Sequence, residues 1–331
     1  MSASSFNRHY SVHGVHIETC APRAEIAAAL HYRLAPFHSD ATGPAAARFE
    51  YVEVTETELA HVPRPTAESV RVIAASEISE FLYAPDEDLL YTSFAGRMKG
   101  RWDARLGVSR VYFPEAELDR LWRLTHPMFT LPLLDCLKRR GRYSVHAAGL
   151  CLNGKGLLFP GNSGHGKTTL TLALLRAGWG YLSDDQVFLT READGVRLLA
   201  FPDEIDVTEN TARMFPELAP VLTAPPRPGW PKRQVQVSEI YGREFVPECE
   251  AAAVIFPRVA HADQTELELM APQEAFFELL ASVTVTDAAS SQAHLDAIGA
   301  LLHQVPCYRM RTGRDLDALP DRLAQLAHRA A

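Results

Sequence analysis

The chain has 331 residues, of which 47% are hydrophobic and 22% are charged, and its formal net charge at pH 7 is −8. This composition is typical of a soluble globular protein long enough for one large or two ordinary domains. It argues against nucleic acid as the main partner, because phosphate backbones are bound by clustered Lys and Arg, and the chain has no large basic block. No apolar run approaches the roughly 20 residues that span a bilayer, so no membrane partner is expected.

The cysteines and the first residues predict a cytoplasmic protein. The five cysteines are scattered, without a C-x-x-C pair or a Cys/His spacing typical of a metal site. Residues 1–10 lack the apolar segment of a signal peptide. We therefore expect reduced thiols, and the sequence leaves a homo-oligomer open.

Residues 1–113 are predicted to form a mixed α/β domain dominated by antiparallel strands. Polar and apolar residues alternate at 11–19, which predicts a strand, and helical spacing follows at 23–32. A turn rich in Gly and Arg is expected at 96–107. Further strands are expected at 49–54, 70–74, 89–94 and 109–113.

Residues 114–140 are predicted to be a helical lead-in. Apolar residues recur there at helical spacing, and Pro127 and Pro132 are expected to divide the segment into separate helices.

Residues 141–331 are predicted to form the third region, a nucleotide-binding domain that ends in helices. Two strands come first, joined by a hairpin turn of the Asn-Gly kind at 153–156. Five prolines make 219–231 an irregular loop, interpreted as a flap. The other elements expected are strands at 143–152, 156–159, 180–185, 188–191, 196–201, 252–256 and 307–310, and helices at 169–175, 272–282, 291–304 and 319–330.

A phosphate-binding sequence lies between the second of these strands and the first helix. The residues are Gly161-Asn162-Ser163-Gly164-His165-Gly166-Lys167-Thr168, a complete G-x-x-x-x-G-K-[ST] pattern, followed by Thr169. Such a loop wraps backbone N–H groups around phosphate oxygens, places its Lys on the β- and γ-phosphates and lends its Thr hydroxyl to Mg²⁺. The sequence therefore predicts ATP and Mg²⁺ as cofactors.

Two carboxylates follow the loop helix. Asp184 and Asp185 end the strand expected at 180–185, and Lys167 precedes them by 17 residues. Adjacent residues at a strand end point to opposite faces, so at most one usually faces a site directly. Beside a nucleotide, one carboxylate can hold Mg²⁺ and the other can accept a proton from an attacking hydroxyl. His146 lies on the preceding strand, where a buried structural role remains the alternative.

The sequence His-Ala-Ala-Gly, the loop and Leu-Ser-Asp-Asp together resemble the HPr kinase/phosphorylase family over roughly residues 142–189. The same core occurs in ATP-dependent phosphoenolpyruvate carboxykinases. The resemblance implies an α/β (α+β) fold with an HPr-kinase-like core. It also implies that His146, Lys167 and Asp184 are catalytic, with Asp184 as the base. Thr168 and Asp185 would bind the metal, and residues 161–169 would bind the nucleotide.

The resemblance implies an ATP-dependent kinase acting on a hydroxyl group, most readily a Ser or Thr of a protein or peptide. Distant relatives modify peptide natural products, so a precursor peptide is one candidate acceptor. A small-molecule kinase, and a nucleotide-dependent regulatory binding protein with little phosphotransfer, remain the alternatives. Whether Lys232, Arg233 and Glu204 join the site stays open.

Two departures from the family predict a kinase without appreciable phosphorolysis. Thr169 stands where HPr kinases usually have an acidic residue, and the later glycine-rich signature of the family has no counterpart. Residues 201–206 bring three carboxylates into that place instead. Their charge would repel a free phosphate.

Overall fold

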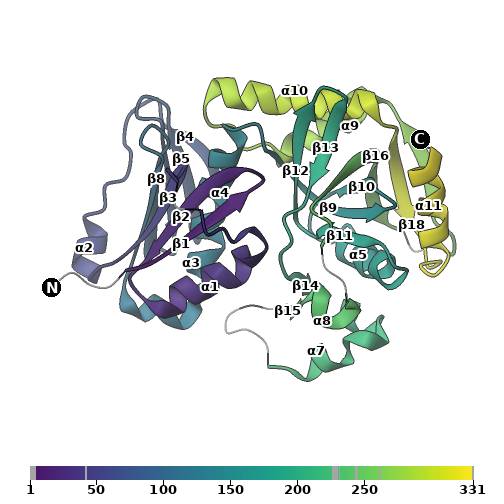
Figure 1. Cartoon of the computed structure of the whole chain (residues 1–331), viewed down its shortest axis with the longest axis horizontal. Helices are drawn as coiled ribbons and strands as arrows, with labels where there is room; N and C mark the ends of the chain where they lie inside the picture. The colour runs from purple at the N-terminus through teal and green to yellow at the C-terminus, as the bar shows by residue number, and fades with distance from the viewer. Residues whose placement is uncertain are drawn as a thin grey trace. The chain divides into compact units, whose positions relative to one another are not determined.

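The computed structural model describes residues 5–41, 43–225, 230, 232–242, 245–260 and 262–329. It has a mixed α/β fold and divides into two compact units (Figure 1). Unit 1 contains residues 1–140 and 284–292, and unit 2 contains residues 141–283 and 293–331. The chain therefore leaves unit 2 for nine residues and then returns to it.

Unit 1 is built on an eight-stranded sheet in the order β1-β2-β3-β8-β7-β6-β5-β4. The β2–β3 and β3–β8 pairs are parallel, and the other neighbours are antiparallel. The strands are β1 (Phe6–Val12), β2 (Val15–Ala21), β3 (Ala47–Glu53), β4 (Arg71–Ala75), β5 (Ser79–Ala84), β6 (Leu89–Phe94), β7 (Met98–Asp103) and β8 (Val108–Phe113). The helices are α1 (Ala24–Leu34), α2 (Glu56–Ala60), α3 (Leu121–Thr125) and α4 (Pro127–Lys138), with 3₁₀ turns at Ala35–Phe37 and Glu115–Arg120.

Aromatic residues from the sheet and from α4 form the core of unit 1. Phe49 of β3 stacks on Trp102 of β7 at 6.2 Å between ring centroids, and Phe129 of α4 lies 4.8 Å from Phe49. All three are buried, and burial of rings of this size contributes most of the stabilisation of such a core.

Three predictions for unit 1 are wrong. The single strand expected at 11–19 is a hairpin, because His13 (φ 50°) and Gly14 (φ 81°) form a turn in the left-handed region between β1 and β2. The turn expected at 96–107 contains β7, whose residues alternate between the two faces of the sheet. The expected division into two helices is found at Pro127, where α4 begins, but Pro132 does not end a helix: α4 continues through it. Its neighbours Met128, Phe129, Leu133 and Leu137 are buried, and their packing offsets the lost hydrogen bond.

Unit 2 contains a sheet in which five strands pair in a closed circuit. The order β10-β9-β12-β13-β16 returns to its start, because β16 also pairs with β10; β18 and β17 extend the sheet beyond β16, and β11 pairs with β9. The strands are β9 (Tyr143–Leu152), β10 (Lys155–Pro160), β11 (Gly180–Ser183), β12 (Gln186–Glu192), β13 (Gly195–Leu199), β16 (Glu248–Val259), β17 (Glu266–Met270) and β18 (Cys307–Thr312), with a separate pair β14 (Ile205–Val207) and β15 (Arg233–Val235). The helices are α5 (Lys167–Arg176), α6 (Glu209–Arg213), α7 (Ala219–Thr223), α8 (Val237–Tyr241), α9 (Pro272–Leu279), α10 (Ala288–Gln304) and α11 (Leu319–Arg329), with 3₁₀ turns at Pro216–Leu218 and Leu280–Ser282. The first residues of α10, up to residue 292, belong to unit 1, and the rest of the helix belongs to unit 2.

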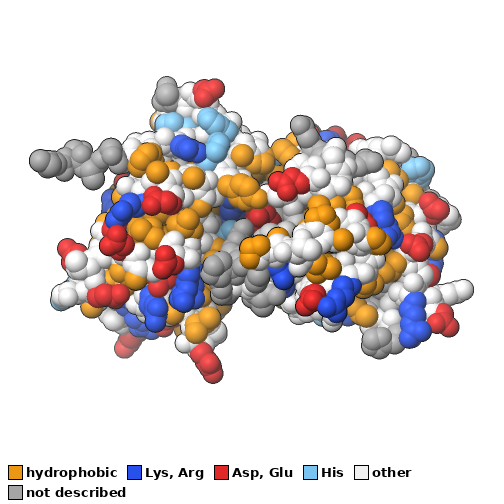
Figure 2. Space-filling view, turned by 90° about the horizontal axis from the view of Figure 1, so that it is seen from below, with side chains coloured by type: hydrophobic (Ala, Val, Ile, Leu, Met, Phe, Trp, Pro, Cys, Tyr) orange, Lys and Arg blue, Asp and Glu red, His pale blue; other side chains and the backbone are white. Residues whose placement is uncertain are grey.

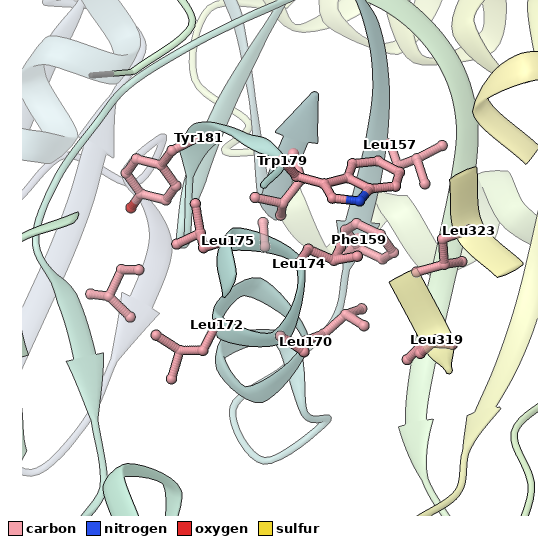
Figure 3. Packing of buried hydrophobic residues seen from close by; sticks show 14 of the residues in the cluster. Leu157, Phe159, Leu170, Leu172, Leu174, Leu175, Trp179, Tyr181, Leu319 and Leu323 are labelled. Carbon is pink, nitrogen blue, oxygen red and sulfur yellow. The ribbon is translucent and has the colours of Figure 1, made fainter. Parts of the chain in front are cut away.

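The helices of unit 2 pack on two separate hydrophobic clusters. Residues of α5 and α11 share one cluster with β9, β10 and β16, whereas residues of α9 and α10 share the other. Figure 3 shows the first cluster, in which leucines of α5 meet Trp179 and residues of β10, β11 and α11. The labelled residues are Leu157, Phe159, Leu170, Leu172, Leu174, Leu175, Trp179, Tyr181, Leu319 and Leu323. This packing fixes α5, and with it the loop that precedes α5, on the sheet.

The segment interpreted as a flap is only partly described. Residues 219–223 form α7, whereas residues 226–229 and 231 lie outside the described residues. Residue 330, the expected end of the last helix, also lies outside them.

Candidate functional site

The phosphate-binding sequence forms the turn between β10 and α5. β10 ends at Pro160, and α5 begins at Lys167. Gly164 (φ 87°) and Gly166 (φ 92°) adopt left-handed backbone conformations, which residues with a side chain rarely adopt. A Cβ on Gly166 would lie 3.1 Å from the side chain of Val259. The sequence thus uses glycine where the backbone turns sharply and where β16 passes close to the loop.

The imidazole of His165 connects two parts of the loop and also connects the loop to β16. Its Nδ1 lies 3.0 Å from the backbone nitrogen of Asn162 and 2.8 Å from Nη1 of Arg258. Both partners are donors, so Nδ1 is the acceptor and the ring is neutral. Burial, followed by the charges of Arg258 and Lys167, lowers the pKa of His165 and favours this neutral form.

Lys167 directs its ammonium group back into the loop. Nζ donates to the carbonyl oxygen of Gly161 and lies 3.4 Å from both the carbonyl oxygen of Asn162 and Nε2 of His146. Burial lowers the pKa of Lys167, while Asp185 and Asp184 oppose this effect. The cation therefore lies within the loop and is surrounded by oxygen atoms of the kind that phosphate would also supply.

Asp184 is buried beneath the first turn of α5. Its Oδ2 accepts a hydrogen bond from Thr168 Oγ1 at 2.9 Å, and its Oδ1 accepts one from Thr171 Oγ1 at 2.8 Å. Thr168 and Thr171 are three positions apart on the helix, so both hydroxyls face the same carboxylate. Burial raises the pKa of Asp184 to about 7, although the two threonine hydrogen bonds lower it. The buried carboxyl group therefore holds its proton more firmly than an exposed aspartate would.

Asp185 points the other way and is 66% exposed. Its Oδ1 lies 3.1 Å from Nδ1 of His146, and its backbone carbonyl accepts from the N–H of Ala147. His146 lies opposite Gln186 in the β9–β12 pairing. The two adjacent carboxylates thus serve different partners, as expected at a strand end: Asp184 contacts α5, and Asp185 contacts β9.

The predicted site residues therefore lie close together on four neighbouring elements. The loop joins β10 to α5, His146 comes from β9, and the two aspartates follow β11. Within the loop, Asn162 and Ser163 are exposed, whereas Thr168 and Thr169 at the start of α5 are half-buried. Their predicted roles in catalysis and binding remain predictions.

Three residues at the site were missed by the sequence analysis. Thr171 could have been found, because it lies one helical turn beyond Thr168. Arg258 and Glu278 are distant in the chain from the loop and belong to no recognisable motif. The guanidinium of Arg258 nevertheless contacts His165, and its Nη2 lies 2.6 Å from Glu278 Oε2.

Of Lys232, Arg233 and Glu204, whose part in the site the sequence left open, only Lys232 is shown to act on the loop. The charge of Lys232 lowers the pKa of Lys167, so it acts on the loop electrostatically. Arg233 donates to the carbonyl oxygen of Ala224, and the backbone N–H of Glu204 donates to Asp203 Oδ1. Among the described residues, no group of three or more His, Cys, Asp or Glu is arranged to hold a metal ion.

Comparisons with known proteins find a likeness in structure alone. No protein-family model matches the chain, and no curated protein matches it. The solved structure of the HPr(Ser) kinase/phosphatase from Coxiella burnetii is similar to 56% of this chain and to 94% of that chain, at 15% sequence identity and a TM-score of 0.31. At this level of likeness, a function must be derived from the residues of the site themselves.

No helix in the described part of the chain is both long enough and apolar enough to span a bilayer. Acidic and basic side chains are interspersed on the face drawn in Figure 2.

Proposed function

We propose that the chain is an ATP- and Mg²⁺-dependent kinase that transfers the terminal phosphoryl group to a hydroxyl, most readily a Ser or Thr of a protein or peptide. One observation carries the proposal. A glycine-rich turn between a strand and a helix presents Lys167, while a buried carboxylate, Asp184, is hydrogen-bonded to the hydroxyl of Thr168.

Nucleotide binding follows from the loop. Its backbone N–H groups and the N-terminus of α5 favour phosphate oxygens. In the proposed complex, the β- and γ-phosphate oxygens replace the carbonyl oxygens of Gly161 and Asn162 as partners of Lys167. A helix fixed by a buried cluster of leucines supports such a loop rigidly, which favours catalysis by positioning.

The donor set fits Mg²⁺. Magnesium prefers hard oxygen ligands and keeps several waters and substrate phosphates, so few protein ligands are needed. The hydroxyl of Thr168 and the exposed carboxylate of Asp185 would hold the ion. It would supply positive charge beside the transferring phosphoryl group.

The acceptor hydroxyl must lose its proton while its oxygen attacks phosphorus. We assign Asp184 as the base, because its carboxylate lies against the first turn of α5 beside Thr168, and because burial raises its pKa, which favours acceptance of a proton. The proton passes to the carboxylate, the bond between the γ-phosphorus and the bridging oxygen breaks, and ADP leaves. His146, beside Asp185 and Lys167, would orient the charged groups.

The difference in exposure between Asp184 and Asp185 favours a second assignment, in which Asp185 and not Asp184 is the base. Asp185 is accessible to an acceptor and contacts His146, whereas both oxygens of Asp184 are occupied by threonine hydroxyls. In this version Asp185 accepts the proton instead of holding the metal, and Asp184 orients Thr168, which would then be the protein ligand of the ion.

Lys167→Ala tests nucleotide binding. We expect most of the Mg-ATP affinity and turnover to be lost, because the ammonium no longer contacts the phosphates. Lys155→Ala, which changes a half-buried lysine at the opposite end of β10 from the loop, is the control and should retain both. Unchanged calorimetric binding together with unchanged ATP turnover in Lys167→Ala would exclude the proposed site.

The two other functions are separated by transfer assays. Labelled phosphate from ATP that appears on a small molecule would favour a small-molecule kinase. Tight Mg-ATP binding without transfer or hydrolysis would favour a regulatory binding protein. A precursor peptide or carrier protein encoded beside the gene would be the first acceptor to test.

A further inference from the structure

Arg258 links the nucleotide loop to the helix α9. One side of its guanidinium meets His165 of the loop at 2.8 Å, and the other side meets Glu278 of α9 at 2.6 Å. The Arg258 side chain is 38% exposed. Glu278 also lies 3.6 Å from Arg309 Nη2, so the carboxylate serves two arginines.

Arg258 lies near the start of the loop, at Gly161, where the terminal phosphate would be held. A Cβ on Gly161 would lie 2.9 Å from Nδ1 of His165, the atom that Arg258 contacts. The carbonyl oxygen of Gly161 accepts from the ammonium of Lys167. The ammonium of Lys167 on α5 thus contacts Gly161 directly, and the guanidinium of Arg258 on β16 contacts His165, the side chain that lies beside Gly161.

The present partners of Arg258 Nη1 are neutral groups that a phosphate oxygen could replace, namely His165 Nδ1 and the carbonyl oxygen of Pro257. A neutral imidazole is a weak partner for a cation compared with a phosphate oxygen, because hydrogen bonds between charged groups are the stronger ones. The ion pair with Glu278 is partly exposed, and such pairs contribute little stability. The planar guanidinium can donate two parallel hydrogen bonds to two phosphate oxygens, which a lysine cannot do.

We infer that Arg258 is a ligand of the terminal phosphate of the bound nucleotide, and that its guanidinium exchanges His165 for phosphate when the loop is occupied. This inference rests on the proposed nucleotide site. Glu278 keeps the guanidinium at the loop in both states. Arg258 thereby adds a second protein cation where charge develops during transfer.

Comparison of Mg-ATP with Mg-ADP binding tests the assignment. A ligand of the terminal phosphate contacts ATP alone. We therefore expect Arg258→Ala to weaken Mg-ATP binding about tenfold or more, the effect of one charged hydrogen bond, and to change Mg-ADP binding less than about twofold. Arg258→Lys should recover part of the ATP affinity, because it keeps the charge and loses the fork.

Arg309→Ala is the matched control. It removes the other arginine beside Glu278, and the ATP-to-ADP affinity ratio should stay that of the unaltered protein. If Arg258→Ala weakens the binding of Mg-ATP and Mg-ADP equally, the inference is overturned. Arg258 would then only hold His165 in place. Unchanged affinity for both nucleotides would overturn it as well.

The experiment distinguishes failure of the kinase proposal from failure of the inference about Arg258. If the unaltered protein binds Mg-ATP but transfers no phosphate, the kinase proposal fails and the inference is still decided by the affinity ratio. If the unaltered protein binds neither nucleotide, both are overturned. Thermal unfolding of each variant checks that the fold is retained.

Discussion

At the scale of single residues, the division of work between Asp184 and Asp185 is the most informative feature of the site. If Asp184 is the base, Asp184→Asn should lower phosphotransfer about 100-fold or more while Mg-ATP binding stays nearly intact. The asparagine can still exchange hydrogen bonds with Thr168 and Thr171, so the fold should hold. Parallel measurement of kcat and of the ATP dissociation constant decides the point, with Asp185→Asn as the matched variant. Near wild-type kcat in Asp184→Asn and a large loss in Asp185→Asn would give the role of base to Asp185.

The buried carboxyl of Asp184 also predicts a pH dependence of stability. Its pKa rises from 3.8 to about 7 on folding because of burial. Well below pH 3.8 both states hold the proton; as pH rises from there toward 7, the unfolded state loses it first, and the folded protein loses stability. The asparagine variant does not titrate. Its free energy of unfolding relative to wild type should therefore increase by up to about 4 kcal/mol between pH 4 and pH 7. Chemical denaturation at a series of pH values measures this difference, and a flat difference would contradict the raised pKa.

At the scale of elements, close packing inside the closed circuit of strands makes Gly156 of β10 difficult to replace. A Cβ there would lie 2.4 Å from Cys249 Sγ and 2.8 Å from Leu198 Cδ1. Gly156→Ala should destabilise the protein by about 1–3 kcal/mol, the usual cost of overpacking a core. Gly299 of α10 has open space around its Cα, so Gly299→Ala should stabilise by about 0.5–1 kcal/mol. The unfolding midpoint should fall in Gly156→Ala and rise in Gly299→Ala. An unchanged midpoint in Gly156→Ala would show that the strands move apart easily to admit a methyl group.

The elements also show what the sequence could and could not predict. The strand at Tyr143–Leu152 is confirmed at both ends, because a largely apolar segment of this length that is closed by an Asn-Gly turn is typical of a buried strand. The short strands β14 and β15 were missed, because three residues are too few to show the alternation of polar and apolar residues that predicts a strand. The position of Arg258 could not be predicted, because it depends on β16 passing beside the loop. The roles given to His146, Lys167 and the aspartates stay predictions.

At the scale of the whole molecule, a buried polar cluster holds the segment 284–292 in unit 1. Asp135 accepts hydrogen bonds from Trp102 Nε1 at 2.8 Å, from Arg139 and from Thr286, and lies 3.3 Å from Lys138 Nζ. No pattern in the sequence indicated this pairing, because the partners are about 150 residues apart.

Removal of that carboxylate should be costly. Asp135→Ala would leave Trp102 Nε1 without its acceptor and the buried ammonium of Lys138 without its carboxylate partner, at about 3–5 kcal/mol. Glu250→Ala, which removes an exposed partner of Lys155, should change stability little, because solvent screens exposed ion pairs. Thermal unfolding compares the two variants, and limited proteolysis should show faster cleavage within 284–292 in Asp135→Ala. Equal melting temperatures would mean that the cluster contributes no net stability.

The pairing of β10 with β16 has a consequence for the synthesis of the chain. β10 ends at Pro160, and β16 begins only at Glu248, so one edge of β10 has no partner while the intervening residues are translated. At ordinary rates of elongation this interval lasts several seconds. The nascent chain then carries the nucleotide loop beside an open, hydrophobic strand edge, which is prone to aggregation. Pairings so distant in sequence also slow folding. We therefore expect the loop to become competent for nucleotide only after β16 has left the ribosome.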